Sequence, residues 1–213
     1  MKKRSDWVMI ILILIFSGLI FGVLYKYLNK RNSTEIINNS LVDSVSFLNF
    51  KEAYLTQLFY MGNWENNRSH SFDSILVYEQ HDEEKRSPLP LTYLFNNKKR
   101  NMIIRYTEIG CNSCADSTFK VIKKYTKFNT LYNIVVLVDF SNYDAYLKWA
   151  KVSEINYPVY WLKKGSLPFK IESENSSYIF TVNVLPEVDN FFVPNSRFSE
   201  YIENYFFSLE ASL

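Results

Sequence analysis

The spacing of apolar residues divides the second half of the chain into short and long segments. From Asn101 onwards, short runs of branched and aromatic residues alternate with segments whose apolar residues recur every three or four positions. The first pattern is typical of strands and the second is typical of helices. The expected strands are 102–106, 133–140, 176–184 and 188–193, with an extended piece at 157–163. The expected helices are 112–128, 143–152 and 197–209, so this part is predicted to be an α/β domain.

A different apolar run, Trp7 to Leu28, lies near the N-terminus. It is interrupted only by Ser17, two glycines and Lys26. As a helix this run would be about 33 Å long, which is enough to cross the hydrocarbon core of a bilayer. No small-x-small cleavage site and no cysteine follows it, which argues against a cleaved signal peptide and a lipoprotein anchor. The sequence therefore predicts an uncleaved transmembrane signal anchor.

Residues 29–90 lie between these two regions and follow no single pattern. Asn29 to Ser40 is polar and is interpreted as a linker, whereas the apolar residues of 41–64 recur at helical spacing. Ser74 to Tyr78 is a candidate strand, and two prolines in 87–91 exclude a central strand or a helix interior there. The expected organisation is a tail at 1–6, a transmembrane anchor at 7–28, a linker and helical or extended arm at 29–90, and the α/β domain at 91–213.

Composition and charge exclude some classes of function. The chain is 47% hydrophobic and 22% charged, which is typical of a folded globular protein. A net charge of +2 gives no argument for a nucleic-acid partner. With only five glycines, the chain also has no glycine-rich phosphate loop. A nucleic-acid partner is therefore not expected, and the thiol chemistry considered next needs no dissociable cofactor.

The candidate chemistry is the pair Cys111 and Cys114, the only two cysteines of the chain. They lie at the predicted junction of strand 102–106 and helix 112–128. Free backbone N–H groups and the positive end of the helix dipole stabilise an anion at such a junction. The pKa of Cys111 is therefore expected to be low, which favours the nucleophilic thiolate. Cys114, one helical turn later, would be within reach to resolve a mixed disulfide.

Two other interpretations of the cysteine pair are open. A zinc site would need two further ligands, and only His70 and His81, in a distant polar stretch, could supply them. A purely structural disulfide is the second, although so short a loop constrains the unfolded chain very little. The redox interpretation is favoured over both, and no metal is expected.

Glu108 lies three residues before Cys111 and has two possible roles. As a nearby anion it would raise the pKa of the thiol, and as a carboxylic acid it could pass a proton to Cys114. The favoured interpretation is a solvated loop carboxylate.

The order strand, cysteine helix, strand, helix, hairpin and helix resembles the thioredoxin fold. Together with the N-terminal anchor, it is most similar to the membrane-anchored thioredoxin-like proteins of bacteria, of the TlpA or redoxin type. The resemblance covers about 91–209 and implies a βαβαββα core preceded by a single transmembrane helix. It also implies that Cys111 is the exposed nucleophile and Cys114 the buried resolving thiol.

Three positions differ from the pattern of that family. Gly110 stands where the family usually has an aromatic residue before the first cysteine, and Asn112-Ser113 separates the two cysteines. Ser176 or Ser177 stands where the family has a cis-proline, and a trans peptide is expected at a non-proline residue. Because that proline shapes the groove for the substrate backbone, Ser176 and Ser177 are assigned to a candidate substrate groove.

The two ends of the anchor carry equal numbers of basic residues, so charge does not predict which end faces the cytoplasm. The expected location therefore follows from the chemistry. A tethered dithiol is useful on the oxidising side of a membrane. We therefore expect an inner-membrane, single-pass protein with a cytoplasmic tail at 1–6 and a periplasmic C-terminal domain. The expected function is a membrane-tethered thiol–disulfide oxidoreductase that exchanges electrons with an upstream redox protein. The resemblance implies that it reduces disulfides of exported proteins. The alternative is a non-catalytic thioredoxin-like binding module with a structural Cys111–Cys114 disulfide.

Overall fold

The computed structural model describes residues 2–66, 68–79, 88–110, 112–125, 127–153, 155–183 and 187–212. Within these ranges, the side chains of 2–16, 32–39, 68, 69, 112, 129, 143 and 153 are not described. The chain forms two compact units, residues 1–55 and residues 56–213.

The first unit is the N-terminal part of one long helix, α1 (Lys2–Glu65). The linker predicted at 29–40 is wrong, because these residues are helical within α1. They include neither proline nor glycine, so nothing in them removes a backbone donor or favours a break. The helix predicted at 41–64 is confirmed as the C-terminal part of α1.

The predicted transmembrane anchor at 7–28 also lies within α1. The side chains of its first part, residues 7–16, are outside the description. Across the described part of the chain, no helix combines the length and the apolar character that a membrane span requires. The anchor stays a prediction.

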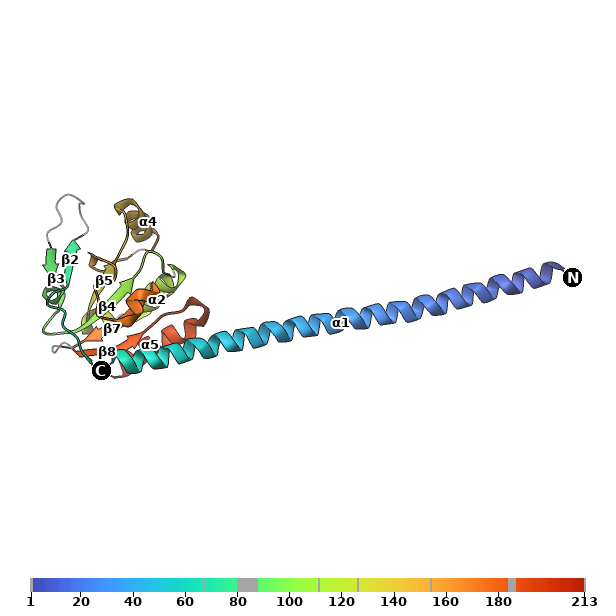
Figure 1. Cartoon of the computed structure of the whole chain (residues 1–213), viewed down its shortest axis with the longest axis horizontal. Helices are drawn as coiled ribbons and strands as arrows, with labels where there is room; N and C mark the ends of the chain where they lie inside the picture. Colours follow the sequence, from blue (N-terminus) through green and yellow to red (C-terminus); the bar gives the residue numbers. More distant parts are fainter. Residues whose placement is uncertain are drawn as a thin grey trace. The chain divides into compact units, whose positions relative to one another are not determined.

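The described residues of the second unit form one eight-stranded mixed sheet (Figure 1). Its strands are β1 (Arg68–Ser69), β2 (Leu76–Glu79), β3 (Pro88–Pro90), β4 (Arg100–Tyr106), β5 (Tyr132–Val138), β6 (Val159–Leu162), β7 (Tyr178–Val182) and β8 (Glu187–Phe192). They lie in the order β1-β8-β7-β4-β5-β6-β2-β3. Strands β4, β5 and β6 run parallel to one another, and the remaining pairs are antiparallel. The strands β4 and β5 therefore occupy the centre, where a parallel strand is covered on both faces.

The helices that connect these strands complete the predicted α/β order. They are α2 (Asn112–Lys124), α3 (Phe128–Leu131), α4 (Tyr143–Ser153) and α5 (Ser199–Ala211), with 3₁₀ turns η1 (Leu91–Leu94), η2 (Lys170–Glu174) and η3 (Ser196–Phe198). From β4 to α5, the elements follow the βαβαββα order of the predicted thioredoxin-like core, with β6 added between α4 and β7. The predicted helix at 112–128 is shorter than expected, because α2 ends at Lys124.

The domain boundary predicted at residue 91 is wrong, because the sheet includes strands from the preceding segment. Strand β2 pairs with β6 and β3 pairs with β2, while β1 pairs with β8. The compact unit accordingly begins at Thr56. Pattern alone did not place β1, β2 and β3 in the sheet, since these short strands are defined by partners far along the chain. The prediction that 87–91 is not a central strand agrees with β3, which lies at the edge of the sheet.

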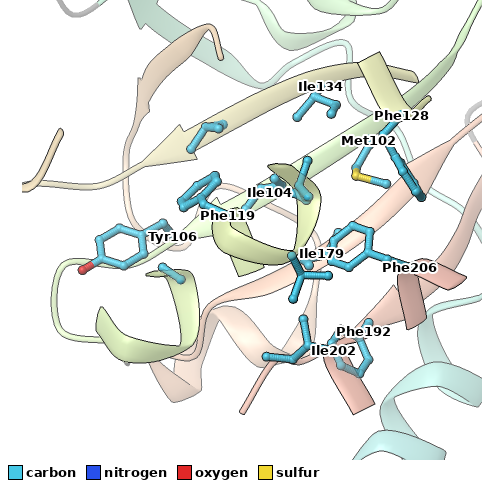
Figure 2. Packing of buried hydrophobic residues seen from close by; sticks show 14 of the residues in the cluster. Met102, Ile104, Tyr106, Phe119, Phe128, Ile134, Ile179, Phe192, Ile202 and Phe206 are labelled. Atoms are coloured by element: carbon cyan, nitrogen blue, oxygen red, sulfur yellow. The ribbon is translucent and has the colours of Figure 1, made fainter. Parts of the chain in front are cut away.

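The two faces of the sheet carry separate hydrophobic cores. Successive side chains of β4 point to opposite faces, so that Ile104 and Tyr106 lie in the first core and Ile103 lies in the second. Figure 2 shows the first core, where Phe119 of α2 and Phe206 of α5 pack over the strands. The second core is rich in aromatic rings from β7 and from the segments around η2; its buried aromatic members are Phe72, Phe169, Tyr178, Phe180 and Phe191.

Candidate active site at the start of helix α2

A tight turn, residues 107–110, leads from the end of β4 to α2. The Gly110 N–H donates to the Thr107 carbonyl oxygen at 2.9 Å. The Thr107 hydroxyl donates to the Asn175 carbonyl oxygen at 2.9 Å, and the Thr107 N–H donates to Ser177 Oγ at 3.4 Å. A side chain at Gly110 would clash with Thr107 Oγ1 and would place its Cβ 3.0 Å from Ser177 Oγ. The turn therefore has no room for the aromatic residue that the family has before its first cysteine.

Of the two predicted cysteines, Cys114 lies in the described part of α2 and Cys111 lies outside the described residues. Cys114 is 4% exposed and is disulfide-bonded. The sequence contains one other cysteine, Cys111. Burial of Cys114 agrees with what the resemblance implies for the second cysteine, while the exposure and nucleophilic role of Cys111 stay predictions.

The segment before α5 contacts the sulfur of Cys114. The backbone N–H of Ser196, the first residue of η3, donates to Cys114 Sγ at 3.3 Å. The hydroxyls of Ser113 and Ser196 are hydrogen-bonded at 2.9 Å. Sequence reasoning missed Ser196, since no motif marks a backbone donor that lies 82 residues from its acceptor.

The structure places Ser177 beside the turn that precedes Cys111. Ser177 is buried, and its Oγ lies against Thr107 and Gly110 as described above. Ser176, its neighbour, is half-buried. All peptide bonds of the described residues are trans, as expected for these serines. Their role in a substrate groove stays a prediction.

A buried ion-pair network lies beneath this turn, on the second face of the sheet. Arg105 is completely buried, and its Nε donates to Glu172 Oε1 while its Nη2 donates to Asp139 Oδ2, both at 2.9 Å. Its Nη1 donates to the carbonyl oxygen of Tyr106 at 2.7 Å. Burial alone would lower the pKa of Arg105, but the carboxylates of Glu172 and Asp139 outweigh it and raise that pKa above its ordinary value.

Further hydrogen bonds extend the network from Arg105 to the loop after β4 and to the loop after β5. Asp139 Oδ1 accepts the N–H of Glu108 at 2.7 Å, and Glu108 Oε2 accepts the N–H of Ser141 at 2.8 Å. Glu108 is therefore not merely a solvated carboxylate, as the favoured interpretation had it, because it joins the turn before Cys111 to the loop after β5. The sequence signal for this network is a charged residue, Arg105, inside the otherwise apolar predicted strand 102–106.

The other oxygen contacts of Glu172 complete the network on the side of η2. Tyr178 donates its hydroxyl to Glu172 Oε1 at 2.7 Å, and the Gly165 N–H donates to Oε2 at 2.9 Å. Burial first, and then the neighbouring carboxylate, raise the pKa of Tyr178 well above its ordinary value. Tyr178 therefore stays a neutral hydrogen-bond donor.

The chain is similar to several solved structures, although no protein-family model matches it and no curated protein is similar to it in sequence. One is the thioredoxin domain of a thiol-disulfide oxidoreductase from Bacteroides vulgatus, with 13% identity and a TM-score of 0.44, covering 65% of this chain and 97% of that one. Another is a secreted disulfide oxidoreductase of Mycobacterium tuberculosis, with 12% identity and a TM-score of 0.42, covering 62% and 94%. A third is the bacterioferritin comigratory protein of Xanthomonas campestris, with 8% identity and a TM-score of 0.47, covering 69% and 96%.

A cleft beside α2 is lined by charged and aromatic side chains. Its lining includes the carboxylates of Glu108 and Asp116 and the ammonium group of Lys148, together with Tyr106 and Trp149. Burial first, and then the carboxylates of Asp116, Asp139 and Glu108, raise the pKa of Tyr106 to about 12. The Tyr106 hydroxyl therefore stays neutral at ordinary pH.

The histidines of the zinc alternative are not brought to the cysteines by any described contact. His70 Nε2 lies 3.6 Å from Glu65 Oε2, and its ring packs against Phe169 with 5.0 Å between ring centroids. His81 lies outside the described residues. Among the residues that could be searched, no three His, Cys, Asp or Glu side chains form a possible metal site.

Proposed function

We propose that this protein is a membrane-tethered thiol–disulfide oxidoreductase that uses the pair Cys111 and Cys114. One observation carries the proposal: Cys114, in the first turn of α2, is buried and disulfide-bonded directly after a parallel central strand. A helix N-terminus at the end of such a strand stabilises a thiolate. The element order from β4 to α5, which the thioredoxin resemblance predicted, supports the same class of reaction.

The burial of Cys114 orders the steps of the exchange. A thiolate of a partner protein can reach only the sulfur of Cys111, so it attacks there and forms a mixed disulfide. The Cys111–Cys114 bond breaks, and its electron pair leaves on Cys114. A second thiolate of the partner then attacks the partner sulfur and releases Cys111 as a thiolate. The pair has gained two electrons and, after protonation, two protons; reduction of an exported protein is the reverse sequence.

The tether and the partners belong to the same proposal. Apolar side chains of the predicted anchor are exposed on α1, among them Leu19, Phe21 and Val23. A bilayer would cover them and would keep the domain near an upstream redox protein on the periplasmic side of the inner membrane. The thiols and disulfides of exported proteins are the proposed substrates, with Ser176 and Ser177 in the groove that receives them.

Cysteine variants of the full chain test the proposal. Cys111→Ser should abolish disulfide exchange, because it removes the attacking sulfur. Cys114→Ser should accumulate mixed disulfides with the natural partner, because nothing resolves them. The measurement is non-reducing electrophoresis of acid-quenched cells, with the double variant as the control that traps nothing. If Cys114→Ser traps no partner while wild-type function persists, the non-catalytic module with a structural disulfide takes the place of the enzyme.

A further inference from the structure

We propose that the backbone N–H of Ser196 is a catalytic group that stabilises negative charge on the sulfur of Cys114 as the disulfide opens. The inference rests on the proposed function, because it assigns a role in that exchange. Its basis is the contact of 3.3 Å between Ser196 N and Cys114 Sγ. The distance is short for a hydrogen bond to sulfur, and the acceptor is one of the reacting atoms.

The chain around Ser196 holds this N–H in position. The side-chain oxygen of Asn195 accepts the N–H of Arg197 at 3.0 Å, and its carbonyl accepts the N–H of Phe198 at 3.0 Å. Phe198 is completely buried. The hydroxyls of Ser113 and Ser196 join the same segment to α2 at 2.9 Å. The donor is therefore fixed before the reaction and needs no rearrangement as charge develops.

The charge balance of the exchange shows why this donor is needed. When a partner's thiolate attacks Cys111, one sulfur–sulfur bond forms, the bond to Cys114 breaks, and its electron pair moves onto Cys114. The Cys114 residue is buried, so water contributes little to the stabilisation of its sulfur. An unpaired buried anion is costly, whereas a hydrogen bond to a charged acceptor is about twice as strong as a neutral one. In the reverse direction, the same N–H holds Cys114 as the thiolate that resolves the mixed disulfide.

The chain offers a matched pair of variants that separates the N–H of Ser196 from its hydroxyl. Ser196→Pro removes the N–H and the hydroxyl, and Ser196→Ala removes only the hydroxyl. Proline is tolerated at the first position of a helical turn. The preceding residue, Asn195, has φ −135° and ψ 120°, which is the backbone region that a residue before proline prefers. The comparison of Pro with Ala therefore reports on one donor.

The first readout is the ionisation of Cys114 in full-length protein that also carries Cys111→Ser. The thiolate fraction, followed by its ultraviolet absorbance across pH, should be about tenfold lower with Pro than with Ala at a pH below both transitions. In protein with both cysteines, Pro should open the disulfide with a small dithiol about threefold more slowly than Ala, since roughly half of the charge has developed at the transition state. Equal thiolate fractions in the Pro and Ala proteins would overturn the proposal.

A second measurement does not depend on the proline variant of Ser196. In the Cys111→Ser protein, the Ser196 amide proton resonance should move downfield as Cys114 ionises, because the N–H then donates to an anion. An amide resonance that does not respond to this titration would also overturn the proposal. Failure of the proposed function is a separate outcome: the cell-based trapping experiment would then be negative, whereas the titrations of Cys114 would still show whether Ser196 stabilises its thiolate.

Discussion

Arg105 is completely buried among aromatic side chains, and its two carboxylate partners make that position tolerable. Glu172 and Asp139 each bond it at 2.9 Å, and both carboxylates accept further N–H or O–H groups. A buried ion pair adds little stability over apolar packing, but removal of one partner leaves an uncompensated charge. The network therefore acts at the residue scale mainly by fixing positions, including that of the turn before Cys111.

Substitution of Arg105 tests this view of the network. Arg105→Met should reduce the free energy of unfolding by about 3–5 kcal/mol, because two buried carboxylates lose their cation. The triple variant with Asp139→Asn and Glu172→Gln should recover a large part of that loss, since no buried charge remains. Urea unfolding of the full chain in detergent, followed by tryptophan fluorescence, provides the measurement. A triple variant no more stable than Arg105→Met would show that packing of the Arg105 side chain dominates.

At the scale of elements, the local pattern predicts the central strands and helices but not their partners. Strand 102–106 and helix 143–152 lie within β4 and α4, because their periodicity reflects one buried face. The last part of the arm predicted at 29–90 instead contributes strands β1, β2 and β3 to the sheet. Its strands are short and are stabilised by pairing with β6 and β8.

The candidate site likewise has one part that the local sequence pattern predicts and one part that it does not. The cysteine pair stands in a recognisable strand-to-helix motif. The contacts of Arg105 with Glu172 and of Ser196 with Cys114 join residues 67 and 82 positions apart, which no local pattern encodes. Local pattern therefore locates the cysteine pair but not the groups that surround Cys114.

The turn between β4 and α2 gives a prediction at the scale of elements. Gly110→Ala should reduce the free energy of unfolding by about 1–3 kcal/mol, because the new Cβ overpacks against Thr107 Oγ1. Adding Thr107→Ala removes that oxygen and should restore part of the stability, whereas adding Thr107→Ser keeps the oxygen and should restore none. Thermal unfolding of the wild type, Gly110→Ala and the two double variants provides the comparison. Equal behaviour of the two double variants would place the strain elsewhere in the turn.

At the scale of the whole molecule, the last turns of α1 belong to the α/β domain. Leu58 and Met61 pack against its cores. Glu65 Oε1 accepts the N–H of Lys170 at 3.2 Å, and Asn66 Oδ1 accepts the N–H of Phe191 at 2.8 Å. The domain therefore includes its own helical lead-in, residues 56–65, whereas the sequence left open whether this part of the arm packs on the domain.

The proposed tether gives the prediction at this scale. The double substitution Leu19→Lys with Val23→Lys should release the full chain from membranes, because each charge opposes insertion by about 2.5–3.5 kcal/mol near the centre of a span. Val42→Lys with Val45→Lys changes two exposed positions of α1 outside the predicted span and is the matched control. Alkaline carbonate extraction followed by sedimentation distinguishes the variants. If wild-type protein is already extracted by carbonate, the chain is not anchored through residues 7–28.

The two edge strands of the sheet affect how readily copies of the protein aggregate when they are crowded together. Strand β1 has only two residues, and β3 places Pro88 and Pro90 on either side of a single leucine. Proline has no backbone N–H, so the β3 border offers few donors to a strand from another molecule. Copies held at high density on a surface would therefore have little opportunity to join edge to edge into aggregates. The two prolines that exclude a central strand at 87–91 therefore also help to keep the protein soluble.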